Sequence, residues 1–206
     1  ELITLIEESK RLGHKDKEDL SVKLPYSQDS FSVPNNVYII GTMNTADRSL
    51  AGLDLALRRR FDFKEMMPDV STLNGLEVNG IEIDTLLSVI NQRIEVLLDR
   101  EHTIGHAYFI GLNNTSTISD LAAIFKNKVI PLLQEYFYED WEKINMVLGC
   151  NRFIAKKEFN NNLFKKPQND AVQLNNKTIW SISADNNVFE DAAQYTQIYA
   201  PINNGA

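Results

Sequence analysis

Residues 41–49 read Gly-Thr-Met-Asn-Thr-Ala-Asp-Arg-Ser and follow a stretch of continuous β-favouring residues, Val37-Tyr38-Ile39-Ile40. Such runs are typical of a strand buried on both faces of a parallel sheet, so we predict a strand that ends at Met43. Ligands bind at the carboxyl edge of these sheets, because the loops there converge on a crevice. The amide, carboxylate, guanidinium and hydroxyl groups that follow the strand therefore form a candidate site. The alternative is a polar turn in which Ser49 caps the next helix and the adjacent acid and base pair.

The flanking sequence predicts the remaining elements of an α/β half-core. Leucines and isoleucines before Gly13 indicate the last turns of a helix, and alternation around Pro25 indicates a β-hairpin over residues 20–33. A short helix is expected over 49–60. Residues 61–66 alternate like a half-buried strand that Pro68 ends.

From residue 69 the pattern becomes helical. Apolar residues recur on one helix face over 84–100, which predicts an amphipathic helix. A second helix is expected to start at a Ser119 cap and to be bent or divided by Pro131, and a third to span 140–148. Tyr136-Phe137-Tyr138 and Trp141 have helical spacing beside leucines, which favours core positions. Residues 151–206 predict a small β-rich appendage with short strands at 153–154, 178–182 and 195–199.

Composition sets limits on function. The 206 residues are 43% hydrophobic and 24% charged, and the apolar runs are far shorter than the roughly 20 residues that a bilayer requires. A lone cysteine, Cys150, cannot form an internal disulfide, which favours a reducing intracellular setting. Residues 61–150 carry six basic and fourteen acidic side chains. This acidic middle disfavours direct DNA binding, which requires cations near phosphates. Neither His14 nor His102 has partners at metal-ligand spacing, so no metal site is assigned.

Residues 43–49 and their surroundings resemble the McrB family, the AAA+ GTPase subunits of McrBC-type methylcytosine-dependent restriction systems. The resemblance covers roughly residues 1–150. It rests on the Met-Asn-Thr-Ala-Asp-Arg-Ser signature and continues through Ser49-Leu50-Ala51, Leu53-Asp54 and Ala56-Leu57-Arg58-Arg59-Arg60-Phe61. It includes two later stretches, Ile104-Gly105-His106-Ala107-Tyr108-Phe109 and Pro131-Leu132-Leu133-Gln134-Glu135-Tyr136-Phe137.

The resemblance implies roles for individual residues. Asn44 matches the sensor-1 asparagine, whose neutral amide orients the water that attacks the γ-phosphate, and Thr45 lies beside it at the nucleotide. Asp47 and Arg48 match the signature's acid and base, which help to position the water and the contacts of the neighbouring subunit.

Arg58, Arg59 and Arg60 match the arginine-finger run, in which one guanidinium reaches the active site of the next subunit. Successive helical residues point about 100° apart, so the three cannot all serve one phosphate, and we favour Arg59. The alternative for the whole run is a solvated helix end.

Two further features have weaker implications. The hairpin of residues 20–33 corresponds to a pre-sensor-1 hairpin that faces the central pore of the ring, although it could equally be a surface decoration. His106 lies where a lid residue can approach the nucleotide, but many AAA+ proteins carry an arginine there. A histidine packed in a helix junction is the alternative for His106.

The sequence contains no phosphate-binding loop and no Walker B strand. Its one Gly-x-x-x-x-Gly spacing, Gly75 to Gly80, is followed by Ile81 and Glu82 instead of lysine and a hydroxyl residue. We therefore expect the chain, which begins without an initiator methionine, to be the carboxyl-terminal part of a longer McrB-like GTPase and to be inactive alone. The alternative function is a non-catalytic, AAA+-derived interaction module in a DNA-defence complex.

The expected fold is a partial AAA+ α/β core over 1–68, a helical lid over 69–150 and the appendage over 151–206. The strands over 37–43 and 61–66 would flank a central strand that the sequence lacks, so we expect a strained remnant, pairing between chains or a rearranged region there. By resemblance, the longer protein would bind GTP or ATP with Mg²⁺, with nothing held tightly by this piece. It would form a ring, expected to be a hexamer, with a nuclease subunit as partner. DNA would bind through a domain outside this chain, in the cytoplasm of a bacterium or archaeon.

Overall fold

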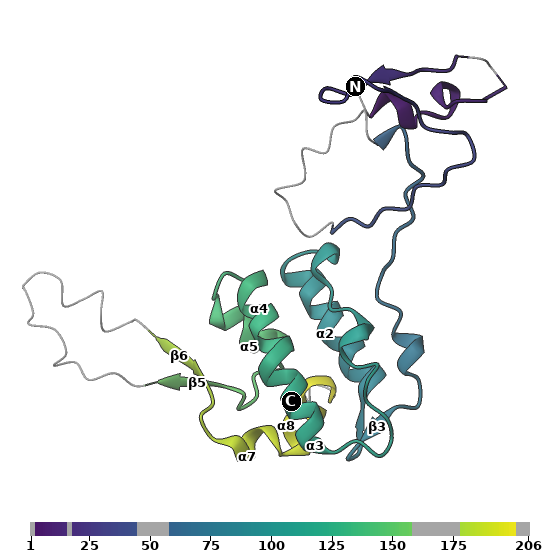
Figure 1. Cartoon of the computed structure of the whole chain (residues 1–206). Coiled ribbons are helices and arrows are strands. Elements are labelled where there is room, and N and C mark those ends of the chain that lie inside the picture. The colour runs from purple at the N-terminus through teal and green to yellow at the C-terminus, as the bar shows by residue number, and fades with distance from the viewer. Residues whose placement is uncertain (1–2, 16–17, 45–57, 158–177, 201–206) are drawn as a thin grey trace, which may run out of the picture. The chain divides into compact units, whose positions relative to one another are not determined.

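A computed structural model describes residues 3–15, 18–44, 58–157 and 178–200. The chain divides into two compact units, Glu1–Met66 and Met67–Ala206. Figure 1 shows both units. None of the helices in the described ranges is long and apolar enough to cross a membrane.

The first unit contains short elements. Strand β1 (Val22–Lys23) pairs antiparallel with β2 (Ser30–Phe31), which confirms the hairpin expected over residues 20–33. The predicted opening helix is wrong, because the segment forms two 3-10 turns, η1 (Thr4–Ile6) and η2 (Glu8–Lys10). Glu7 separates the turns with extended backbone angles, φ −59° and ψ 136°, which an α-helix cannot contain.

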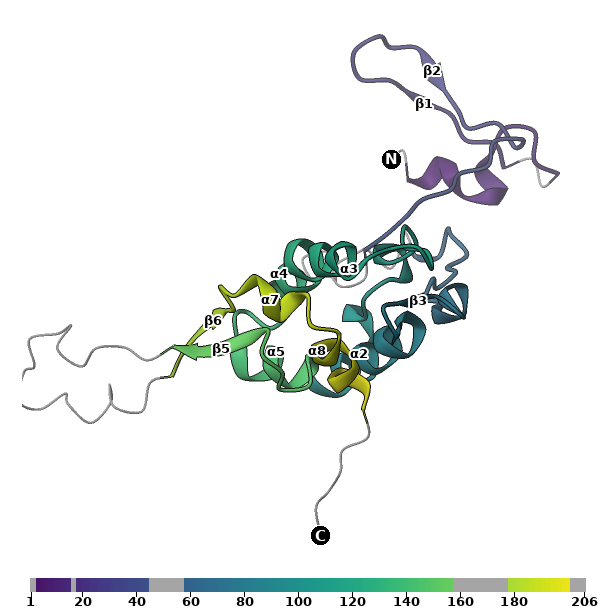
Figure 2. The ribbon, with the colours of Figure 1, turned by 90° about the horizontal axis from the view of Figure 1, so that it is seen from below.

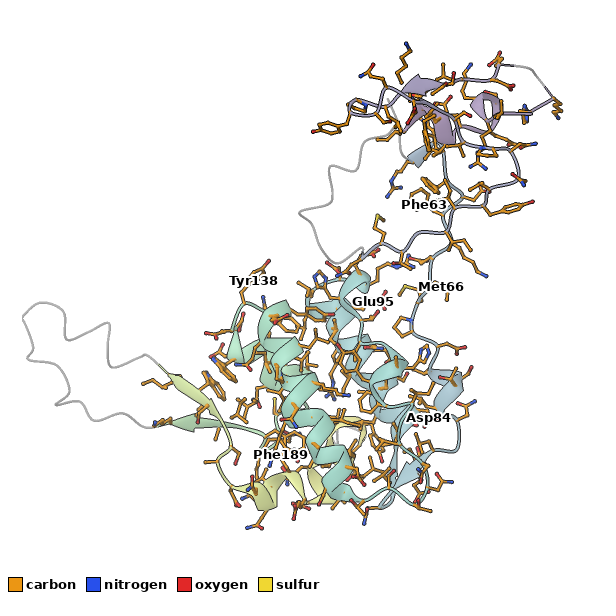
Figure 3. All side chains as sticks on the ribbon, viewed as in Figure 1. Phe63, Met66, Asp84, Glu95, Tyr138 and Phe189 are labelled. Atoms are coloured by element: carbon orange, nitrogen blue, oxygen red, sulfur yellow. The ribbon has the colours of Figure 1, made fainter. Side chains whose placement is uncertain are left out.

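The strands expected at residues 37–43 and 61–66 are wrong. Neither segment forms a strand in the described part of the chain. Tyr38 is 90% exposed and Ile40 is 94% exposed, and Phe63 and Met66 are also exposed (Figure 3). A strand is stable only when its backbone groups pair with neighbours, and the described residues offer these two segments no partner strand. High β propensity alone therefore does not produce a strand here.

The second unit begins with short turns and a hairpin and then becomes helical. Helix α2 confirms the amphipathic helix predicted near residues 84–100. The elements in chain order are η4 (Val70–Leu73), β3 (Glu77–Val78), β4 (Ile81–Glu82), α2 (Ile83–Leu97), η5 (Arg100–His102), η6 (His106–Tyr108), α3 (Ile118–Ile124), the π-helical turn η7 (Phe125–Val129), α4 (Ile130–Tyr136) and α5 (Trp141–Val147).

The two glycines of the Gly-x-x-x-x-Gly spacing lie at the β3–β4 hairpin: Gly75 precedes β3, and Gly80 is in the turn between the strands. Asn79 and Gly80 occupy its two-residue turn with φ values of 50° and 79°. Positive φ at both central positions is the geometry of a type I′ turn. This spacing therefore has a structural explanation that involves no phosphate.

Helix α3 is capped by Thr117, so the prediction of a Ser119 cap is wrong. The Asp120 carboxylate accepts hydrogen bonds from the Thr117 amide and hydroxyl, at 2.8 and 2.9 Å. The predicted division at Pro131 is confirmed, since η7 separates α3 from α4 immediately before it. Proline has no amide hydrogen, and its ring clashes with the carbonyl four residues earlier, which widens the preceding turn.

The aromatic residues after α4 are only partly in the core. Phe137 is buried, and Tyr136 and Trp141 pack against the core. Tyr138, expected to be buried, is 92% exposed and stands at the loop between α4 and α5 (Figure 3). Its φ of 48° shows that the helix has already ended, so helical spacing no longer decides where its side chain points.

The C-terminal segment forms a hairpin and two helices. Strands β5 (Ile154–Lys157) and β6 (Ile179–Ile182) lie near the strands predicted at 153–154 and 178–182. They pair antiparallel and project from the helices in Figure 1. Helices α7 (Asn186–Phe189) and α8 (Ala192–Tyr199) follow, so the strand predicted at 195–199 is wrong. Asp191 caps α8 by accepting the Ala193 amide hydrogen at 3.0 Å, and Tyr195 and Ile198 lie one helical turn apart on its buried face.

One continuous core connects this segment to the lid helices. Helix α8 lies beside α2, as Figure 2 shows from below. The ring of Phe125 contacts three other core aromatics, with centroids 6.3 Å from Phe109, 5.7 Å from Phe153 and 5.0 Å from Tyr195. Residues on both sides of position 151 therefore share the same buried cluster.

Candidate functional site

The described part of the signature segment is open to solvent. Residues Gly41 to Asn44 have no regular secondary structure, and Asn44 is exposed. Thr45, Asp47 and Arg48 lie outside the described residues, as does the possible Ser49 cap. The expected roles of these residues in positioning an attacking water are therefore supported by the sequence signature alone.

The three consecutive arginines have different environments. The Arg58 guanidinium lies over the Phe63 ring, 5.3 Å from its centroid. Arg60 forms an ion pair with Glu7, and the side chain of Arg60 is only 9% exposed. Arg58 and Arg59 are both exposed, and among the described residues Arg59 makes no hydrogen bond, ion pair or ring contact. Arg59 is therefore the guanidinium with the greatest freedom to reach another molecule.

His106 begins the short helix η6 in the second unit. Its Nδ1 atom accepts a hydrogen bond from the Asp69 amide, at 3.0 Å. Asp69 in turn caps η4, where its carboxylate accepts the Ser71 amide at 3.0 Å and the Ser71 hydroxyl at 2.6 Å. These bonds from Ser71, with a smaller contribution from His106, hold the pKa of Asp69 below its ordinary value. Because Nδ1 is an acceptor, a neutral His106 ring carries its proton on Nε2.

Asn91 is a buried polar residue that sequence reasoning missed. Its side-chain amide donates to the Ile104 carbonyl at 2.9 Å and accepts the Ile104 amide hydrogen at 2.7 Å. The available signal was an asparagine within the apolar stripe of the predicted helix, next to Ile90 and three residues before Ile94.

The other histidines have local partners. His102 Nδ1 lies 2.6 Å from the Asp99 carboxylate, and its ring meets the Tyr136 ring edge-on at 4.9 Å. Burial is the main cause that raises the pKa of Tyr136. His14 Nε2 lies 3.8 Å from Glu8. Within the residues that the structure describes, no group of three or more histidine, cysteine or carboxylate side chains could hold a metal.

Two open depressions lie on the second unit. One, of about 360 Å³, is lined by η4 and α2 residues that include Val70, Asp84 and Ser88. The other, of about 420 Å³, lies between η4 and residues 110–115. Neither is lined by Asn44, His106 or an arginine, so the candidate residues do not converge on either of them.

Comparison with known families defines the class of protein. Residues 1–61 match the AAA domain of the dynein-related subfamily, and residues 82–145 match the alpha-helical lid domain of McrB. The chain therefore combines a segment similar to an AAA domain with a segment similar to the McrB lid.

A curated relative makes the assignment more specific. The chain is 39% identical, over 158 residues, to the type IV methyl-directed restriction enzyme EcoKMcrB subunit of Escherichia coli strain K12. The alignment covers 68% of this chain and 33% of the relative, so the chain spans about a third of that protein's length. The chain is McrB-like, which confirms the resemblance inferred from the signature.

Proposed function

We propose that this chain is part of a nucleotide-hydrolysing AAA+ motor subunit, with GTP as the expected substrate, in a modification-dependent DNA restriction system. The observation that carries the proposal is the exposed Arg59 within the segment that matches the AAA domain, while Arg58 lies over the Phe63 ring and Arg60 forms an ion pair with Glu7. In a ring of identical subunits, expected to be a hexamer, Arg59 acts in trans on the nucleotide of the neighbouring subunit.

The proposed chemistry follows from charge and hydrogen bonding. Asn44 orients the attacking water through its neutral amide, with Thr45, Asp47 and Arg48 positioning the water and the subunit contacts. The Arg59 guanidinium stabilises negative charge that develops on the γ-phosphoryl oxygens. His106, whose Nδ1 is engaged by Asp69, would offer its Nε2 hydrogen to the nucleotide.

The described residues include a group suited to binding the phosphates of a nucleotide, but no cluster suited to binding its Mg²⁺ ion. An exposed guanidinium is a suitable partner for a phosphate, whereas Mg²⁺ prefers several oxygen ligands that the described residues do not bring together. No step is therefore assigned to Mg²⁺ through these residues. The chain alone is expected to release no phosphate, and measurable turnover by it would contradict that expectation.

The partners of the longer protein are part of the same proposal. They are identical subunits, a nuclease subunit and DNA bound through a domain outside this chain, in a bacterial or archaeal cytoplasm. The hairpin β1–β2 would face a substrate in the central pore. The second candidate, a non-catalytic interaction module, would keep Arg58 to Arg60 as interface groups. It is distinguished by a parent gene that lacks a Gly-Lys-Ser/Thr loop.

The trans assignment of Arg59 can be tested by mixing variants of the longer protein. Arg59→Ala should lower the rate of GTP hydrolysis by about 10³-fold, as loss of an arginine finger does elsewhere. Asn44→Ala should impair the same reaction from within its own subunit. Mixed rings of the two variants contain some interfaces with both residues intact, so mixing should restore part of the activity.

Arg58→Ala is the matched control and should retain most of the activity, because in the proposal Arg59 alone reaches the neighbouring nucleotide, while the Arg58 guanidinium lies over the Phe63 ring. Unchanged hydrolysis by Arg59→Ala, or failure of mixed rings to recover any activity, would count against Arg59 as a trans-acting finger.

A further inference from the structure

Asn91 occupies a core position that normally excludes polar groups. It lies on α2 beside the face formed by Leu87, Ile90 and Ile94, all of which are fully buried, and it is itself only 9% exposed. A buried amide is costly unless both its donor and its acceptor are paired. Both are paired here, and with the same residue, because Asn91 binds the carbonyl and the amide hydrogen of Ile104.

This pairing fixes the backbone that leads to His106. The Ile104 side chain is 1% exposed, so the residue is held by its side chain and by both of its backbone polar groups. Gly105 follows in an extended conformation as the cap of η6, and His106 is the next residue. The backbone is therefore fixed at Ile104, only two residues before the His106 imidazole, by the side-chain amide of Asn91.

His106 then connects this fixed loop to the start of the second unit. Its Nδ1 accepts the amide hydrogen of Asp69, two residues after Met67, at which this unit begins. The polar contacts run in series from Asn91 to Ile104 and from His106 to Asp69. A buried helix position is linked in this way to residue 69, about 20 residues earlier in the chain.

We propose that Asn91 is a positioning residue, which holds the His106 imidazole in one place and one tautomer and thereby anchors Asp69 to the lid. The use of the free Nε2 hydrogen rests on the proposed function, whereas the anchoring itself does not. Asn91 touches no nucleotide in this proposal and acts only through the Ile104 backbone.

Nuclear magnetic resonance of this chain tests the anchoring directly. Asn91→Leu keeps the side-chain size but removes both hydrogen bonds, so amide exchange at Ile104 and at Asp69 should accelerate by about tenfold or more. The imidazole nitrogen shifts of His106 should change from one tautomer to a mixture. Gln92→Leu, at the exposed neighbouring position, should change neither. Exchange that accelerates at Ile104 alone, with the His106 tautomer unchanged, would overturn the proposal.

A pair of His106 variants provides a second test that does not disturb the core. In His106→Asn the amide oxygen can replace Nδ1, so Asp69 should stay protected from exchange, whereas His106→Gln places its amide further out and should lose that protection. If Asn91→Leu fails to fold, this pair of variants and the His106 tautomer of the unmodified chain still test whether His106 anchors Asp69. A mixed tautomer in the unmodified chain, or equal protection in both variants, would contradict the proposal.

The longer protein separates this inference from the proposed function. If both hold, Asn91→Leu should raise the KM for nucleotide by about tenfold and leave kcat nearly unchanged, since it disturbs binding geometry and no reacting group. An absence of nucleotide hydrolysis in the unmodified protein would remove the proposed function but leave the exchange and tautomer results standing. A normal KM in Asn91→Leu, with the exchange and tautomer changes present, would contradict the contact between His106 and the nucleotide and leave the anchoring of Asp69 standing.

Discussion

At the scale of single residues, the end of α5 shows how tightly the second unit is packed. Gly149 has a φ of 79°, and its amide donates to Met146 at 3.1 Å while the Cys150 amide donates to Asn145 at 2.7 Å. These two bonds form a Schellman motif, which satisfies the last carbonyls of a helix. The Arg93 guanidinium donates to the carbonyls of Val147 and Ile198, at 2.9 and 2.6 Å, and so joins the ends of α5 and α8.

Gly149→Ala is expected to destabilise the chain for two reasons. A side chain at this φ costs about 1–2 kcal/mol. The new methyl group would also meet the Ile198 Cα at 3.0 Å and the Arg93 Nη1 at 3.2 Å, which adds about 1–3 kcal/mol. The measurement is the free energy of unfolding in urea.

Gly75→Ala is the matched control, because its φ is 73° but nothing lies within 4 Å of the added methyl. It should show only the backbone cost. Equal destabilisation by the two substitutions would mean that the contact with α8 and Arg93 contributes nothing.

At the scale of elements, helix α3 depends on an acidic group at its start. The Asp120 carboxylate accepts two hydrogen bonds from Thr117, first from the amide and then from the hydroxyl, and these lower the pKa of Asp120 from its ordinary value of 3.8. A carboxyl group with a lowered pKa in the folded state stabilises the fold above its ordinary pKa. That stabilisation is lost as the pH falls through the lowered value.

Asp120→Asn should therefore remove part of the acid sensitivity of the second unit. The free energy of unfolding of the parent chain should decrease as the pH falls below 3.8, and that of the variant should decrease less over the same interval. Near neutral pH the variant should be less stable than the parent chain, since the charged acceptor is absent. Parallel pH profiles for the two chains would show that this cap does not titrate with folding.

The elements also show which structures the sequence could predict. Helix α2 was predictable, because its apolar period and its polar face are local properties of the sequence. Residues 37–43 were not, since a strand needs hydrogen bonds from residues far away in sequence, and local propensity does not report whether such a partner exists. The strand expected at 195–199 failed for a different reason, because Tyr195 and Ile198 are three positions apart, which places them on one face of a helix but on opposite faces of a strand.

The candidate site was predictable to a different degree. The signature and the arginine run could be identified from residue order, and the structure adds that Arg58 and Arg59 are exposed whereas Arg60 is paired with Glu7. The Asn91–Ile104 and His106–Asp69 contacts were not predictable, because each joins residues 13 or 37 positions apart whose proximity is set by packing and not by local sequence.

At the scale of the whole molecule, the two units have different internal support. Leu5 is the only fully buried large apolar residue described in the first unit, whereas the second has a continuous core that includes residues from both α2 and α8. Residues 67–206 are therefore expected to fold as one cooperative unit. The C-terminal segment should be required for that stability, since it supplies Phe153, Phe189 and Tyr195 to the core.

Truncation tests this dependence. A chain of residues 67–206 should show a single cooperative transition by circular dichroism on heating, whereas residues 67–150 should lack one. Removing large buried aromatics costs about 3–5 kcal/mol each, which is a large share of the stability of a domain. Phe153→Ala in the longer piece should lower the transition temperature, and Ile179→Ala, at an exposed position of β6, is the control. Cooperative melting of residues 67–150 at the same temperature would contradict the expectation.

The Arg93 contact with Ile198 also has a consequence for synthesis of the protein. The two residues are 105 positions apart, and the Glu82 amide similarly donates to the Tyr199 hydroxyl across 117 positions. During translation α2 leaves the ribosome long before α8 is synthesised. At 5–20 residues per second, that interval lasts on the order of 5–20 seconds. Over that interval the face of α2 that packs against α8 remains uncovered in the nascent chain.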